Sequence, residues 1–197
     1  MLADARLRDL IGVSFLFAVV QLAFAGFMVL TLRTAAEISL SEAGLVMAYT
    51  YAAAIAGRVF WGWLADRLSR AAPVLVGLGL LMGLACLGFA LLRPGLPLSL
   101  LVGLGMLVGA SSTGWNGVYL AELARLAGAR SAASVTGAAL VVTYIGSLVG
   151  PLLFGAMIWL AGTQTAAFGV LGALTIIAML AWSLARRPDR MPPTTHR

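Results

Sequence analysis

Long apolar segments alternate with short polar stretches along most of the chain. Each segment has roughly the 20 residues that a helix needs to cross the hydrocarbon core of a bilayer. The pattern predicts an all-α membrane protein with six transmembrane helices between a short segment, 1–9, and a basic tail, 186–197. The predicted spans are residues 10–32, 43–64, 73–92, 96–123, 132–160 and 165–185.

Turn-forming residues set the boundaries between these spans. Arg93-Pro94-Gly95 separates the third apolar segment from the fourth. Residues 131–185 hold no charge, and because this run is too long for one crossing, Gly162-Thr163-Gln164 is expected to divide it. The fourth segment is longer than a bilayer requires, so its helix is expected to tilt or to extend into water.

Composition agrees with the hydropathy pattern. Hydrophobic residues make up 61% of the 197 and charged residues 10%, with a mean hydropathy of +1.01. Soluble domains carry about 25% charged residues. A net charge of +6 would suggest nucleic-acid binding in a soluble protein. Here the cations lie in short loops between apolar runs, which favours a role in membrane topology over nucleic-acid binding.

The distribution of arginine predicts the orientation in the membrane. All thirteen cationic side chains are arginine, and eleven fall at the two termini or in and beside the loops after the second and fourth spans. Arg33 and Arg93 lie on the other side. Because arginine-rich loops stay cytoplasmic, both termini are expected inside. Exclusive use of arginine is typical of GC-rich bacterial genes, which indicates the bacterial inner membrane.

The apolar segments carry no set of catalytic or metal-binding residues. Cys86 is the single cysteine, and the single histidine, His196, lies in the tail. The carboxylates Glu37, Glu42 and Glu122 fall at the ends of spans. Enzymatic activity, a metal site and a cofactor are therefore not expected.

The loop between the second and third spans carries a recognisable motif. Residues 62–70 read Gly-Trp-Leu-Ala-Asp-Arg-Leu-Ser-Arg, which resembles the major facilitator superfamily signature Gly-x-Leu-Ala-Asp-Arg-x-Gly-Arg-Arg/Lys. Ser69 stands where the signature has glycine, and Ala71 where it has a final cation. Residues 115–122 resemble the end of that family's tenth span, and Thr136-Gly137 with residues 146–155 resemble its eleventh.

The resemblance covers about residues 9–187 and implies the C-terminal half of a twelve-span secondary transporter, with two inverted three-helix repeats. Residues 146–155 also resemble a fifth-span motif of the N-terminal half, which is the alternative assignment. The resemblance implies transport of a small solute by alternating access, with an N-terminal six-helix half or a second copy of the chain as partner. We expect a fragment or truncated gene rather than a self-sufficient half. Any proton-titrating group would then lie in the other half. A non-transporting membrane scaffold is the alternative.

The resemblance also implies a role for the motif. In the family, the aspartate at the position of Asp66 braces one half against the other at the cytoplasmic face. Gly57 and Gly62 are expected to let the second and third helices approach closely. A solvated positive-inside loop is the alternative interpretation. The predicted cytoplasmic gate residues are Arg58, Gly62, Asp66, Arg67, Arg70, Glu122 and Arg125.

In such a half, the first and fourth spans correspond and line the central cavity. With the fourth span treated as one helix, Ser112, Asn116 and Tyr119 share about 60° of arc. The alternative is that the polar groups bridge helices and the aromatic rings lie at a membrane interface. The predicted substrate-binding residues are Gln21, Phe24, Ser112, Trp115, Asn116, Tyr119 and Tyr144.

Small residues and proline predict two further features. Gly105, Gly109, Thr113 and Gly117 form a ridge on the fourth span that is suited to helix packing. In the fifth span, Gly150 and Pro151 predict a helix bend, because proline removes one backbone hydrogen bond.

Overall fold

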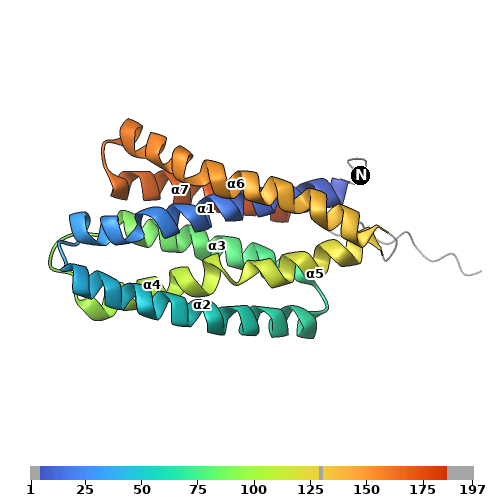
Figure 1. Ribbon diagram of the computed structural model, residues 1–197, viewed down its shortest axis with the longest axis horizontal. Coiled ribbons are helices and arrows are strands. Elements are labelled where there is room, and N and C mark those ends of the chain that lie inside the picture. The colour runs from blue at the N-terminus through green and yellow to red at the C-terminus, as the bar shows by residue number, and fades with distance from the viewer. Residues whose placement is uncertain (1–4, 129–130, 186–197) are drawn as a thin grey trace, which may run out of the picture.

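The computed structural model describes residues 5–128 and 131–185, which form seven α-helices (Figure 1). These are α1 (Ala5–Ala35), α2 (Leu40–Leu68), α3 (Ala71–Ala90), α4 (Leu98–Ser112), α5 (Trp115–Ala127), α6 (Ala132–Ala161) and α7 (Gln164–Ala185). Since α4 and α5 together make one crossing, the described residues provide six segments able to span a membrane. The prediction of an all-α protein with six spans is confirmed. The tail 186–197 and Arg130 lie outside the described residues.

The helices extend beyond the apolar segments that predict them. α2 continues to Leu68, and α1 already begins at Ala5. A capping box starts α2, because the Glu42 N–H donates to Ser39 Oγ and the Ser39 N–H donates to the Glu42 carboxylate. Gly162, with φ of +80°, ends α6 where a break is predicted. Hydropathy detects the apolar part of each helix, whereas these caps determine where the backbone turns.

The six spans pack in pairs that repeat an internal symmetry. The most extensive contacts join α1 to α6, α2 to α4 and α3 to α7. Exchanging the first three spans with the last three converts the α1–α6 pair into the α4–α2 pair and maps the α3–α7 pair onto itself. Figure 1 shows α2 and α4 side by side along one edge of the bundle. This pairing is what two three-helix repeats produce.

Glycine brings α4 into backbone contact with α2. A Cβ on Gly109 would overlap the carbonyl oxygen of Thr50, and one on Gly105 would lie 2.6 Å from the Thr50 hydroxyl. The predicted ridge therefore packs closely at these two positions. Gly117 has open space instead, since it follows the break between α4 and α5.

The prediction that Gly57 and Gly62 bring the second and third helices together is wrong. A Cβ on Gly57 would lie 2.7 Å from the carbonyl oxygen of Ala110, which belongs to α4. Gly62 has no atom within 4 Å of the Cβ position. Although α3 follows α2 in the chain, the face of α2 that carries Gly57 packs on α4.

Pro151 lies inside α6, which continues as one helix from Ala132 to Ala161. The glycines on its N-terminal side contact α1: Cβ atoms on Gly146 and Gly150 would lie 2.7 and 2.9 Å from backbone atoms of that helix. Close packing against α1 accounts for both glycines. The bend itself stays a prediction.

Candidate functional site

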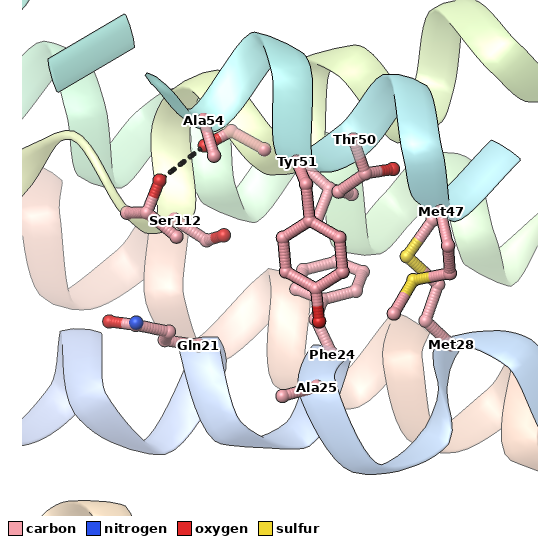
Figure 2. A pocket seen from close by; sticks show the side chains of 12 residues that line it. Gln21, Phe24, Ala25, Met28, Met47, Thr50, Tyr51, Ala54 and Ser112 are labelled. Atoms are coloured by element: carbon pink, nitrogen blue, oxygen red, sulfur yellow. Dashed lines mark hydrogen bonds between the residues drawn. The ribbon is translucent and has the colours of Figure 1, made fainter.

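A cavity of about 100 Å³ lies between α1, α2 and α4. Figure 2 shows Gln21, Phe24 and Met28 of α1 on one side of it and Thr50 and Tyr51 of α2 on the other. The last turns of α4 close it from behind. All side chains that line it are uncharged, and most are apolar. Such a lining accommodates a small organic group and offers it a few hydrogen bonds.

The cavity lies beside the break between α4 and α5. A helix that ends leaves carbonyl groups without N–H partners, and hydrocarbon supplies no water to satisfy them. Here side chains from α2, α5 and the break itself donate in place of the backbone. The bonds are Thr113 Oγ1 to the Gly109 carbonyl (2.8 Å), Trp61 Nε1 to the Ala110 carbonyl (2.9 Å) and Trp115 Nε1 to the Ser112 carbonyl (3.0 Å).

The expectation that the fourth span is one continuous helix is therefore wrong. A Cβ on Gly114 would overlap the ring of Trp61, so glycine leaves the room in which this indole enters the break. Ser112 belongs to α4, whereas Asn116 and Tyr119 belong to α5, so the predicted shared arc spans the break between the two helices.

Trp115 connects the break to α1. Its side chain is buried, and Nε1 donates to Gln21 Oε1 at 3.1 Å in addition to the Ser112 carbonyl. The ring also packs edge-to-face on Phe17, with 5.5 Å between centroids. These contacts orient the indole and, through it, the Gln21 amide at the cavity wall.

Three predicted substrate-binding residues, Gln21, Phe24 and Ser112, line the cavity. Trp115 lies behind Gln21 and does not line it. Phe24 stacks on Phe168 with 4.9 Å between centroids, so this wall continues into the core of the bundle.

The other predicted binding residues lie away from the cavity lining. Tyr119 is buried in α5, and its hydroxyl has no hydrogen-bond partner within the described part of the chain. Asn116 is half-buried on the same helix. Tyr144 is 67% exposed on α6.

The predicted gate residues gather near the end of the bundle where α2 and α5 finish, but they make few direct contacts. Among them, Glu122 and Arg125 form the single ion pair: Arg125 Nε and Nη2 donate to the two carboxylate oxygens at 2.7 and 2.8 Å. Glu122 is buried, whereas the Arg125 side chain is 69% exposed. Arg67 lies over the ring of Trp63 at 5.5 Å. Arg58, Asp66, Arg67 and Arg70 are exposed too.

The turn after α2 explains the glycine of the family signature. Ser69 occupies that position with φ of +48°, and its N–H donates to the Asp66 carbonyl at 3.1 Å. This left-handed conformation ends the helix and suits glycine better than a residue with a Cβ. The sequence departs from the signature, yet the backbone keeps the geometry for which glycine is suited.

Sequence reasoning missed the contribution of α2. Met47, Thr50 and Tyr51 form a cavity wall, and Trp61 caps the end of α4. The predicted cavity residues lie mainly on the first and fourth spans, whereas the contact at Gly109 brings α2 against the same space. The small-residue ridge on the fourth span was the signal that could have placed α2 there.

A family model described as Major Facilitator Superfamily matches residues 10–197. The comparison with curated proteins gives no match. The match covers all six spans of the described structure and agrees with the signature loop between α2 and α3. The chain is a multi-pass membrane protein and belongs to the major facilitator superfamily, a family of membrane transporters.

Proposed function

We propose that the chain moves a small solute across the bacterial inner membrane by alternating access, as one six-helix half of a secondary transporter. The cavity between α1, α2 and α4 carries this proposal. It lies beside a helix break whose free carbonyl groups are capped by side chains. Broken helices at a site within the membrane are typical of secondary transporters.

A second six-helix half would complete the site. α2 and α6 expose large apolar side chains, among them Ile55, Val59, Leu148 and Leu152. The proposal places an N-terminal half or a second copy of the chain against this surface. Asp66 and the other exposed gate residues then act as a cytoplasmic gate at the edge of the contact between the two halves.

Cysteine accessibility tests alternating access, because the single native cysteine, Cys86, is fully buried. Ser112→Cys places a thiol of similar size in the cavity. In proteoliposomes, a membrane-impermeant maleimide is expected to modify this variant from either side and to leave the wild-type chain unlabelled. Asp66→Asn is expected to change the ratio of labelling between the two sides. Labelling from one side alone under every condition would refute the mechanism.

A matched pair of serine substitutions tests the orientation. Ser69 and Ser41 are both exposed and lie at opposite ends of α2. In intact cells, Ser41→Cys is expected to react with the impermeant maleimide, whereas Ser69→Cys is expected to react only after the membrane is opened. The reverse pattern would place both termini outside.

A further inference from the structure

Two of the four hydroxyl groups that line the cavity are already engaged. Thr50 Oγ1 donates to the Val46 carbonyl at 2.8 Å, and Thr113 Oγ1 donates to the Gly109 carbonyl at 2.8 Å. Each hydroxyl has one hydrogen, so neither donates to a ligand without losing its bond. Within the described residues, no hydrogen bond engages the hydroxyls of Tyr51 and Ser112, and the rest of the wall consists largely of Phe24, Met28 and other apolar groups.

The contact with Trp115 determines which end of the Gln21 amide is available. An indole N–H only donates, so the Gln21 atom that it meets at 3.1 Å is the carbonyl oxygen. The NH₂ group of Gln21 therefore remains free of this bond and carries two donor hydrogens. Since Gln21 lines the cavity, it offers hydrogen-bond donors there.

Size and charge restrict the ligand further. The cavity of about 100 Å³ is smaller than the roughly 150 Å³ apolar cavity that holds one benzene molecule, so it suits an acyl-sized group. The rest of the ligand would extend past Tyr51, which is 59% exposed at the rim. An ionised group would be desolvated here without a counter-charge, which is strongly unfavourable.

We infer that the cavity takes an uncharged, largely apolar molecule whose carbonyl-type oxygen accepts a hydrogen bond from the Gln21 amide. This inference rests on the proposed function, since it names the class of solute for the same cavity. Gln21 is the binding residue. Trp115 is a positioning residue that keeps the NH₂ group of Gln21 available to the ligand.

Three probes of nearly equal shape test the inference. 4-Fluoroacetophenone carries the acceptor oxygen, 4-fluoro-α-methylstyrene replaces C=O with C=CH₂, and 4-fluorobenzoate carries a charge. Binding to the full chain in lipid nanodiscs is measured by ¹⁹F NMR titration, which separates bound from lipid-dissolved probe. One hydrogen bond predicts about fivefold tighter binding of the ketone than of the alkene, and burial of charge predicts at least about tenfold weaker binding of benzoate.

Substitutions test whether Gln21 and Trp115 cause the preference for the ketone over the alkene. Gln21→Leu is expected to abolish the ketone preference, whereas Gln164→Leu, the same change at the distant start of α7, is expected to keep it. Trp115→Phe retains an aromatic ring but releases the amide, so the preference is expected to fall while binding of the alkene persists. Equal affinity for all three probes, or a preference that survives Gln21→Leu, would overturn the inference.

These experiments can refute the inferred ligand class and the proposed transport independently. A chain that prefers the ketone but shows one-sided labelling of Ser112→Cys would refute the proposed transport alone. A chain with two-sided labelling that binds benzoate as tightly as the ketone would refute the ligand class alone.

Discussion

Gly109→Ala is expected to force α2 and α4 apart. The added Cβ would overlap the Thr50 carbonyl oxygen and lie 3.1 Å from the amide nitrogen of Ala54. These obstructing atoms belong to the backbone, so rotation of a side chain cannot relieve the contact. Thr50, Ala54 and Gly109 also line the cavity, and the same displacement would therefore change its shape.

The magnitude follows from two opposing terms. Adding a methyl group to a packed interface costs about 1–3 kcal/mol, and the rigidity of the backbone here favours the upper end. Replacing a helical glycine with alanine gains about 0.5–1 kcal/mol. The expected net loss is about 2 kcal/mol of unfolding free energy. A Cβ on Gly57 of α2 would likewise lie 2.7 Å from the Ala110 carbonyl oxygen, whereas ordinary contact begins at 3.4 Å, so the two backbones approach closely at this glycine as well.

Equilibrium unfolding in bicelles by SDS titration, followed by circular dichroism, measures this loss. Gly103→Ala is the matched control, because it makes the same change on α4 where no atom lies within 4 Å of the new Cβ. The control is expected to unfold at the wild-type SDS fraction or slightly above it. If Gly109→Ala and Gly103→Ala unfold together, the backbone contact between α2 and α4 does not stabilise the protein as argued.

Two further predictions use the same unfolding assay. Ser69→Gly is expected to stabilise the chain by about 0.5–1 kcal/mol, because φ of +48° strains a residue with a Cβ; a lower unfolding midpoint would contradict this. Arg125→Ala is expected to destabilise by about 1–2 kcal/mol more than Glu122→Ala, because it leaves a buried carboxylate unpaired, whereas the reverse change leaves an exposed guanidinium. Equal losses for the two alanine variants would contradict that reasoning.

The sequence alone predicts the spans with little error, because crossing a bilayer demands a long apolar run that can be read residue by residue. Each predicted span falls almost entirely within an observed helical segment. The signature motif likewise places a tight turn between the second and third spans, where Ser69 adopts the conformation that suits the family's glycine.

The cavity was predicted only partly. Gln21, Phe24 and Ser112, which belong to the predicted substrate-binding set, line it. Asn116 and Tyr119 do not, and both lie on α5, beyond the break that ends α4. A regular 100° per residue is assured only while one helix continues, so the predicted arc assumed a continuity that α4 and α5 lack.

Hydropathy, breakers and arginine placement thus determined the helices and the expected orientation, because each depends on local composition against water and lipid. The tertiary structure alone decided where the fourth span breaks and which side chains meet at the cavity. Trp61 of α2 donates to the Ala110 carbonyl of α4, and Trp115 of α5 orients the Gln21 amide of α1. Such contacts depend on how helices rotate and approach, which glycine packing sets in three dimensions and no local pattern records.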